Sequence, residues 1–259
     1  MVSKFACSNC GQCCTNPAGG STKSAEFPSF VGQGPFFILN RPGVTFYEWE
    51  LPAARKAAAR LKVRLNPVPL MLVYDLKSKT SIIINYTLKE QKCPFYGKIK
   101  NRTGCMIYNE RPLECRAFPA PAGLAWFLKG ELALCPKQCP AELPAGELAV
   151  EFGSSAKPPV FMKNLIERYG KTHTSQCCAD LLFRAEMDFL TAKEVEGKIR
   201  LERAVVPPEK LAAAVRKSGK TTLSRFYARL GFAKERSEML KNCTDLSQVS
   251  EAARAVTGE

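Results

Sequence analysis

The chain opens with a dense cysteine segment, Phe5-Ala6-Cys7-Ser8-Asn9-Cys10-Gly11-Gln12-Cys13-Cys14, in which four cysteines fall within eight residues. The spacing is C-x2-C-x2-C-C. Thiolates this close on a short loop can turn toward one point, as a metal ion or a metal–sulfur cluster requires. Gly11 permits a tight loop whose backbone N–H groups offset the thiolate charge. We therefore interpret the chain up to about residue 140 as completing and covering a metal site.

Further cysteines return later in the chain, and three of them, Cys93, Cys135 and Cys139, each precede a proline. The C-x2-C-x2-C run resembles the one that supplies three thiolates to a cubane cluster in bacterial-type ferredoxins, where a distant Cys-Pro supplies a fourth. The only histidine, His173, lies outside the cysteine-rich segments. A nearly pure sulfur ligand set selects zinc or iron–sulfur over metals that prefer oxygen.

The spacing favours an iron–sulfur cluster, with 4Fe-4S preferred, over zinc. Structural zinc sites usually pair two separated C-x2-C knuckles, whereas this chain has one dense run and several single cysteines. Two four-thiolate sites are an alternative. The adjacent Cys13 and Cys14 then serve different metals, or one of them is a spare thiol.

The composition predicts a folded protein of the cytoplasm. The chain has 259 residues, of which 46% are hydrophobic, without an apolar run of membrane-spanning length or an apolar signal segment at its start. In a reducing compartment the twelve cysteines would not persist as disulfides, so metal or catalytic roles are favoured. Cys243 stands alone and is interpreted as a buried apolar residue.

The formal net charge of +14 is spread over both halves of the chain. Residues 1–149 hold 19 basic and 10 acidic residues, and residues 150–259 hold 19 and 14. Such a charge fits an anionic partner, either RNA or an acidic protein surface. The alternative is a basic protein whose lysines are simply solvated.

The residue patterns predict an α+β fold with a cysteine-rich metal-binding domain over residues 1–148 and a helical C-terminal lobe over residues 149–259. A loop region with a short strand at residues 36–39 precedes a helix within residues 46–62. Apolar runs at residues 68–74 and 81–88 predict a β-hairpin. Further helices are expected at residues 160–169, 179–201, 207–217, 221–231, 233–241 and 246–256.

The cysteine pattern resembles a known family. F-x-C-x-x-C-G-x-C-C, then C-P-F, then G-C-x-I-Y-x-x-R-P-x-x-C-R-x-F-P, then C-P are similar to the YkgJ-type CxxCxxCC family, described as zinc- or iron-chelating. The match covers about residues 5–140. The resemblance implies a shared metal site made by Cys7, Cys10, Cys13, Cys14, Cys93, Cys105, Cys115 and Cys135, with Cys139 as a ninth candidate.

Two other functions are weighed against a metal-binding accessory, electron-transfer or maturation role. One branch of the family resembles flagellin lysine-N-methylases, which carry such a cluster and use S-adenosylmethionine (SAM). The chain lacks a glycine-rich strand–loop–helix fingerprint for that cofactor and the C-x3-C-x2-C spacing of radical chemistry. The third hypothesis is a basic RNA-binding module with structural zinc, using a C-terminal stripe that includes Arg225, Phe226 and Tyr227, which is otherwise a solvated face beside a core.

Four smaller features complete the prediction. Arg116 is expected to donate to the cluster and Tyr108 to lie near it, although arginines here could instead pair with Glu110 and Glu114. The segment 218–222 ends like a phosphate loop but has Ala214 where glycine is required, so it is interpreted as a helix break. Cys177 and Cys178 are interpreted as core or spare thiols, with an extra metal or redox site beside His173 as the alternative. No catalytic residue is assigned, since no nucleophile–base pair is visible.

Overall fold

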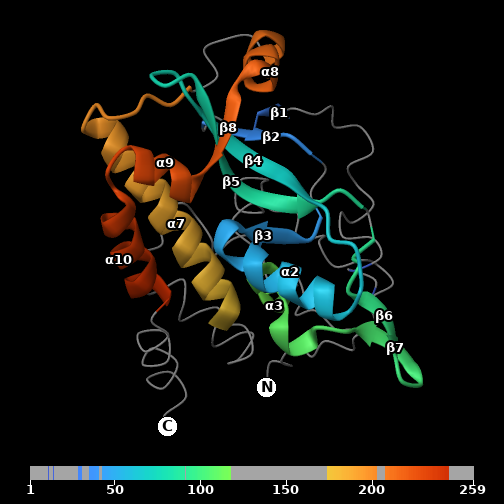
Figure 1. Cartoon of the computed structure of the whole chain (residues 1–259). Coiled ribbons are helices and arrows are strands. Elements are labelled where there is room, and N and C mark those ends of the chain that lie inside the picture. Colours follow the sequence, from blue (N-terminus) through green and yellow to red (C-terminus); the bar gives the residue numbers. More distant parts are fainter. Residues whose placement is uncertain are drawn as a thin grey trace, which may run out of the picture.

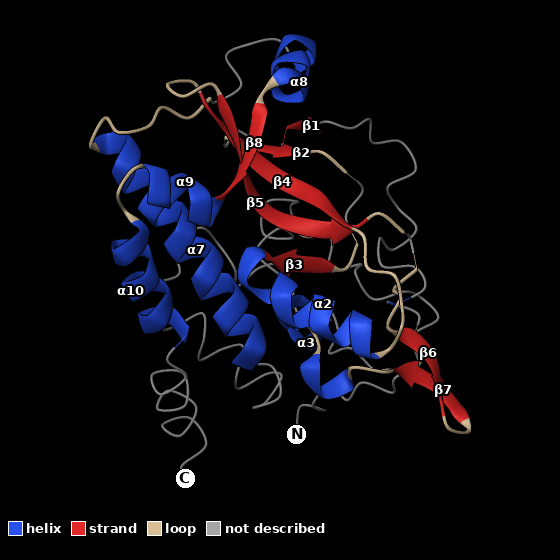
Figure 2. Cartoon of the chain, in the orientation of Figure 1, coloured by secondary structure: helices blue, strands red, loops and turns tan. Residues whose placement is uncertain are grey.

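The computed structural model describes residues 11, 14, 29–30, 35–40, 43–90, 92–117, 174–202 and 208–244. Strands and helices are mixed and most strand pairs are antiparallel, which confirms the α+β prediction (Figures 1 and 2). The strands are β1 (Ser29–Phe30), β2 (Phe36–Ile38), β3 (Thr45–Tyr47), β4 (Pro67–Asp75), β5 (Thr80–Leu88), β6 (Tyr96–Ile99), β7 (Arg102–Cys105) and β8 (Gly219–Thr222). The helices are α2 (Leu51–Arg60), α3 (Leu113–Ala117), α7 (Thr174–Val195), α8 (Pro208–Lys217), α9 (Leu223–Arg229) and α10 (Ala233–Thr244), with 3-10 turns η1 (Glu48–Glu50) and η2 (Tyr108–Glu110).

The predicted hairpin forms the centre of the main sheet. β4 and β5 pair antiparallel over almost their whole length, because both are apolar runs rich in residues that favour strands. The path through the sheet is β1-β2-β4-β5-β3, and β8 joins β5 off this path. A second, two-stranded sheet is made by β6 and β7.

Two strands from distant parts of the chain share one edge of β5. β3 pairs antiparallel with the second half of β5, where Tyr47 lies opposite Asn85. β8 pairs parallel with the first half, where Thr222 lies opposite Ile83. The two strands therefore run toward each other along this edge. Both leave the sheet where they meet, β3 into η1 and β8 into α9.

Side chains alternate between the two faces of the sheet, as the period of a strand requires. Met71 and Val73 join one apolar cluster with residues of α7 and α9, including Phe183 and Phe226. Leu72 and its neighbours on the other face pack against Val215 of α8. A third cluster lies under α2 and reaches the β6–β7 hairpin. The sheet thus forms one core with helices from the C-terminal part of the chain.

The helix predictions that fall on described residues hold with shifted boundaries. α2 begins at Leu51 with Pro52 in its first turn, as expected, but residues 45–47 before it form strand β3. α8 ends at Lys217, as predicted, yet the segment after it is strand β8, which the sequence interpretation of a simple helix break missed. α7 covers Thr174–Val195, so it begins earlier than residue 179. It also ends before the predicted residue 201, because Leu201 forms an antiparallel bridge with Asp75 instead.

Several predictions fall outside the described residues. These are the helices at residues 160–169 and 246–256 and the domain boundary between residues 148 and 149, which stays a prediction. Among the helices that the structure describes, none is both long and apolar enough to cross a membrane.

Candidate metal centre

Four of the predicted metal-ligand cysteines lie in the described part of the chain, and all four pack in the cluster under α2. Cys93, between β5 and β6, and Cys105, at the end of β7, are buried. Cys14, from the N-terminal segment, and Cys115, in α3, are partly buried and pack against the same cluster. All four are present as thiols. The fold thus gathers thiols from four separate segments into one apolar environment.

Backbone hydrogen bonds join the N-terminal cysteine segment to the later ones. The Cys93 N–H donates to the Cys14 carbonyl at 2.8 Å, and the Cys14 N–H donates to the Gly11 carbonyl at 3.0 Å. The β6–β7 hairpin continues this framework, since Tyr96 pairs with Cys105 across its two strands. The position of Cys14 relative to Cys93 is therefore set by the main chain.

Gly11 occupies a position at which any other residue would be strained. Its φ is +78°, in the left-handed region that glycine adopts without a steric penalty. A Cβ placed on Gly11 would lie 1.9 Å from Cζ of Tyr96, well inside van der Waals contact. The backbone of the cysteine segment thus lies directly against the Tyr96 ring, which would have to move for a residue with a Cβ at this position.

Replacing Gly11 with alanine should lower the free energy of unfolding by about 2–4 kcal/mol, since a left-handed conformation and a ring clash are both introduced. The matched control is Gly197→Ala, where φ is +68° but a Cβ would meet nothing within 4 Å. In that control the free energy of unfolding should fall by only about 1 kcal/mol, the cost of the left-handed backbone conformation. Urea unfolding midpoints compare the two. Equal losses in both variants would show that the Tyr96 contact contributes nothing.

The residues around α3 are held by local contacts. The Arg111 side chain donates from Nε to the Tyr108 carbonyl at 2.8 Å and lies over the Tyr108 ring at 3.8 Å. Glu110 forms an exposed ion pair with Arg60 at 2.8 Å, and Glu114 accepts from the Tyr47 hydroxyl at 3.3 Å. These contacts connect the segment around α3 to α2 and to β3.

The remaining candidate residues lie outside what the structure places. Cys7, Cys10, Cys13, Cys135, Cys139 and His173 are not among the described residues. Arg116, Cys177 and Cys178 are placed only by backbone, in α3 and α7. Within the described part alone, no group of three His, Cys, Asp or Glu side chains is arranged to hold a metal ion.

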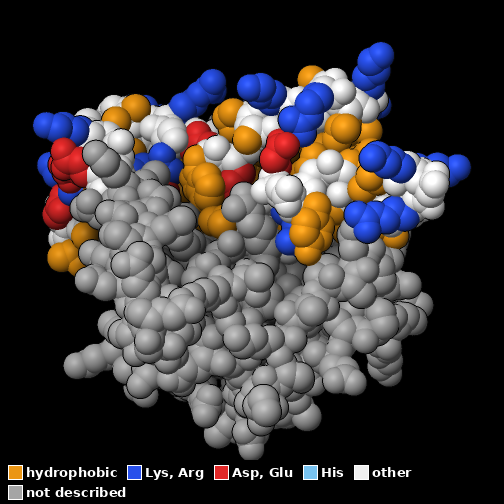
Figure 3. Space-filling model, turned by 90° about the horizontal axis from the view of Figure 1, so that it is seen from below, with side chains coloured by type: hydrophobic (Ala, Val, Ile, Leu, Met, Phe, Trp, Pro, Cys, Tyr) orange, Lys and Arg blue, Asp and Glu red, His pale blue; other side chains and the backbone are white. Residues whose placement is uncertain are grey.

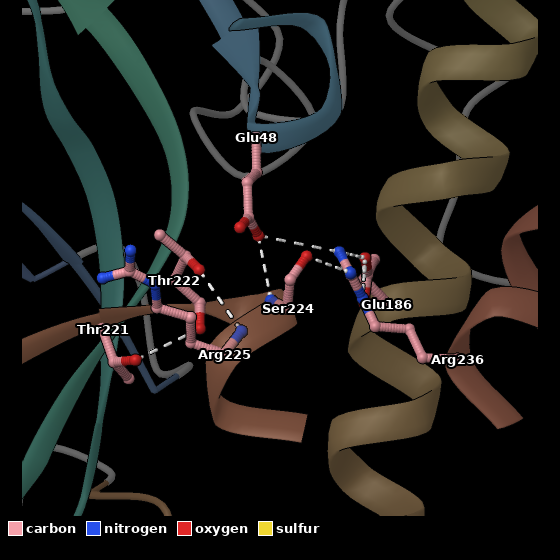
Figure 4. A network of polar contacts seen from close by, with 7 residues as sticks. All are labelled: Glu48, Glu186, Thr221, Thr222, Ser224, Arg225 and Arg236. Atoms are coloured by element: carbon pink, nitrogen blue, oxygen red, sulfur yellow. Dashed lines mark hydrogen bonds and ion pairs between the residues drawn. The ribbon is translucent and has the colours of Figure 1, made fainter. Parts of the chain in front are cut away.

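A second cluster of polar side chains, which the sequence patterns did not indicate, lies where β3 and β8 meet (Figure 4). Arg236 of α10 donates to the Glu186 carboxylate of α7 at 2.6 Å and 2.9 Å and to the Ser224 hydroxyl at 2.6 Å. Glu48 accepts the Ser224 backbone N–H at 2.9 Å. These groups border a small, mostly apolar hollow lined by Tyr47, Glu48, Trp49, Ile84, Phe183, Glu186, Leu223 and Arg236.

The electrostatics of this cluster are those of a buried ion pair. Burial raises the pKa of the Glu186 carboxyl above its usual range, and the hydrogen bonds and charge of Arg236 act against that rise. Burial and then the Glu186 charge raise the pKa of the nearby Tyr227 hydroxyl. Because Glu186 and Arg236 engage each other, we interpret the cluster as a link between α7, α9, α10 and η1. The partners are 50 residues apart, so no local spacing pattern could have revealed them.

The predicted RNA-binding stripe includes two core residues. Phe226 and Tyr227 of α9 are both 0% exposed. They cannot stack on bases, which is how aromatic side chains contribute to single-strand binding. The alternative interpretation, a charged face beside a core, describes these two residues correctly.

The described thiols define a class of protein, one whose fold gathers cysteines from distant segments into one apolar cluster. A family model described as “CxxCxxCC: Putative zinc- or iron-chelating domain” matches residues 6–140. Because this match spans more than half of the chain, the protein belongs to the CxxCxxCC family, as the cysteine pattern predicted. Searches of curated proteins and of solved structures gave no significant match.

The donor set and the backbone both fit a sulfur-ligated metal. Thiolates are the ligands of structural zinc and of iron–sulfur clusters. The Gly11 backbone lies in a cradle that a Cβ would fill, which holds the cysteine segment close to the hairpin that carries Cys105. The family-level assignment of zinc or iron chelation therefore agrees with the chemistry of the described residues.

Proposed function

We propose that this protein holds an iron–sulfur cluster, with 4Fe-4S favoured over zinc, in an accessory electron-transfer role. The observation that supports the proposal is the collection of Cys14, Cys93, Cys105 and Cys115 in one apolar cluster. When bound, such a cluster accepts and releases single electrons, and its potential is set by burial and by hydrogen bonds to sulfur. The proposal places the protein in the cytoplasm, where thiols stay reduced.

The chain's own residues would hold the cluster and shield it from water. Cys93 and Cys105 are 7% and 8% exposed, so their sulfur atoms lie in surroundings of low polarity. Phe95 and Ile107 of the same cluster are buried beside them. Cys7, Cys10, Cys13, Cys135 and Cys139 are proposed as further ligands, and Arg116 as a donor to the site. The dense C-x2-C-x2-C run at the N-terminus favours iron over zinc. Its spacing resembles that of iron–sulfur clusters, whereas structural zinc sites usually pair two separated C-x2-C knuckles.

Anaerobic purification followed by an absorption spectrum and metal analysis tests this proposal. An iron–sulfur protein is brown because of sulfur-to-iron charge transfer, and it contains iron together with acid-labile sulfide. A colourless protein with stoichiometric zinc would replace the proposed function with a structural zinc site. A protein without either metal after anaerobic purification would contradict both.

The anionic partner expected from the net charge is proposed to bind beside the thiol cluster. Residues 51–104 hold twelve Lys and Arg but only two Asp and Glu. Ten of these basic residues are exposed, and we call them the basic surface. They lie on α2, on the segments that follow α2 and β5, and on the β6–β7 hairpin. The ten are Arg55, Lys56, Arg60, Lys62, Arg64, Lys89, Lys92, Lys98, Lys100 and Arg102. In Figure 3, basic side chains gather toward the right, where Figure 1 places β6 and β7.

Packing joins the parts of the basic surface. Leu61, Val63 and Leu65 pack on the cluster that contains Phe95 and Cys105. The Lys89 N–H donates to the Asn66 carbonyl at 3.0 Å. The large hydrophobic side chains exposed in the described part of the chain are Trp49, Tyr108 and Val195. None of them belongs to the elements of the basic surface, and the Arg111 guanidinium lies over one face of the nearby Tyr108 ring at 3.8 Å, which limits stacking by bases. These features favour an acidic protein over RNA as the partner.

Reversing two charges on the hairpin, Lys98→Glu with Lys100→Glu, should weaken retention on immobilised poly-L-glutamate, so that the protein elutes at clearly lower salt. The control, Lys217→Glu with Lys220→Glu, changes the net charge equally at exposed positions on α8 and β8. An equal shift for both pairs would refute a localised surface. Tighter retention of the unmodified protein on single-stranded RNA than on poly-L-glutamate at equal salt would favour RNA instead.

A further inference from the structure

A buried carboxylate connects the sheet to the helix that carries Cys115. Glu50 is the last residue of η1 and is 9% exposed. Its Oε2 accepts the Tyr47 backbone N–H at 2.9 Å, and its Oε1 accepts the Leu113 backbone N–H at 2.8 Å. Leu113 is the first residue of α3 and lies 63 positions away in the chain. The two oxygens of one side chain thus bind both partners at once.

Helix α3 depends on such contacts for its position. It has five residues, Leu113–Ala117, too few to be stable as an isolated helix. The first N–H groups of any helix lack partners within the helix, and a charged acceptor satisfies one of them strongly. Glu50 supplies this acceptor for Leu113, and the Tyr47 hydroxyl donates to Glu114 at 3.3 Å. Both contacts come from the β3–η1 segment.

The placement of α3 decides where the Cys115 thiol lies. Leu113 packs against the cluster between the sheet and α7, and Cys115 packs against the cluster that contains Cys93 and Cys105. The helix therefore lies between the two apolar clusters, with its thiol on one of them. Leu113 and Cys115 are only two positions apart in α3. A shift of Leu113 therefore moves Cys115 relative to the other thiols.

We propose that Glu50 is a positioning residue for the metal centre, holding Cys115 in place through the Leu113 N–H. The metal-binding part rests on the proposed function, whereas the positioning of the thiol does not. Glu48, two residues earlier in the same turn, is oriented to the C-terminal helices instead, where it accepts the Ser224 N–H and lies 4.0 Å from Arg236. One turn thus offers a test residue and a matched control.

The experiment compares Glu50→Gln with Glu48→Gln. Glutamine keeps the shape but has one oxygen acceptor and an NH2 donor, so either Tyr47 or Leu113 would face a donor. In anaerobically purified protein, alkylation by N-ethylmaleimide, followed by peptide mass spectrometry, gives the Cys115 rate relative to Cys93. We expect this ratio to rise about tenfold in Glu50→Gln, the equivalent of one lost charge-assisted hydrogen bond, and to stay unchanged in Glu48→Gln. Bound metal should fall in Glu50→Gln alone.

The outcomes separate this proposal from the proposed function. An unchanged ratio in Glu50→Gln, or an equal rise in both variants, would overturn the positioning role. If Glu50→Gln does not fold, Tyr47→Phe removes only the hydroxyl that donates to Glu114, and a selective but smaller rise for Cys115 is then required. A protein purified without metal would refute the proposed function, while the ratio of alkylation rates would still decide the role of Glu50.

Discussion

Replacing Arg236 with methionine should lower the free energy of unfolding by about 3–5 kcal/mol, because it leaves the Glu186 carboxylate buried without its partner. The Arg236 and Glu186 side chains are 9% and 7% exposed, so water cannot take over the lost hydrogen bonds. The Ser224 hydroxyl loses its contact with Arg236 as well. Urea unfolding followed by tryptophan fluorescence measures the change.

Two further variants show whether the loss comes from the buried pair. Arg229→Met removes an exposed arginine from α9 and should change the free energy by less than about 1 kcal/mol. The double change Glu186→Met with Arg236→Met removes both charges, and it should recover much of the stability, since well-packed apolar pairs can replace buried ion pairs. A double variant as unstable as Arg236→Met would show that shape, and not charge, is responsible.

The same variant should depend on pH in a defined direction. The pKa of Glu186 is already raised in the folded protein by burial, and removing Arg236 takes away the charge that opposes this rise. A carboxyl group whose pKa is higher in the folded than in the unfolded protein binds its proton more readily in the folded state. The free energy of unfolding therefore falls as the pH rises from the unfolded-state pKa to the folded-state pKa. The difference in the free energy of unfolding between Arg236→Met and the unmodified protein should therefore be smaller at pH 5 than at pH 8.

Replacing Cys93 with alanine or serine should remove the bound metal and lower the melting temperature by roughly 10 °C or more. Binding free energy of a metal at a site absent from the unfolded chain adds directly to stability. A loss of about 3–5 kcal/mol corresponds to such a shift for a chain of this size. Cys93 is buried and its backbone bonds to Cys14, so it lies at the junction of two cysteine segments.

The control for this prediction is Cys243→Ser, a change in α10 beyond the residues matched by the family. It should keep its full metal content, so that any change in its melting temperature comes from packing and not from loss of metal. Chelator treatment should bring the unmodified protein down to the melting temperature of Cys93→Ala but leave that variant unaffected. A Cys93→Ala protein with its full complement of metal would remove Cys93 from the ligand set.

The central part of the fold could be predicted from the sequence because its signal is local. The apolar runs of β4 and β5 and the Pro207–Pro208 start of α8 each announce their element within a few residues. β8 gives no such signal, since Gly219-Lys220-Thr221-Thr222 is polar and partly exposed. Its strand conformation comes from pairing with the apolar β5, a contact between residues more than 130 positions apart.

The candidate site likewise has a part that could be predicted from the sequence and a part that could not. Cysteine spacing indicated sulfur ligation, and the family match agrees with it. Glu50, Glu48, Glu186 and Arg236 could not be found, because isolated acidic and basic residues usually lie on a solvated surface. Their role follows from the tertiary contacts that bury them. Gly11 was noticed for its loop-forming freedom, but its contact with Tyr96 needed the fold.

The meeting of β3 and β8 on one edge of β5 has a consequence for synthesis on the ribosome. β3 can cover the second half of that edge as soon as β5 is made, but the first half pairs with residues 219–222. Until those residues emerge, the backbone groups of Thr80–Ile83 form an open edge, to which a strand of another nascent chain could add. The N-terminal half of the protein must therefore await its own C-terminal part, and chains halted before β8 would be prone to aggregate.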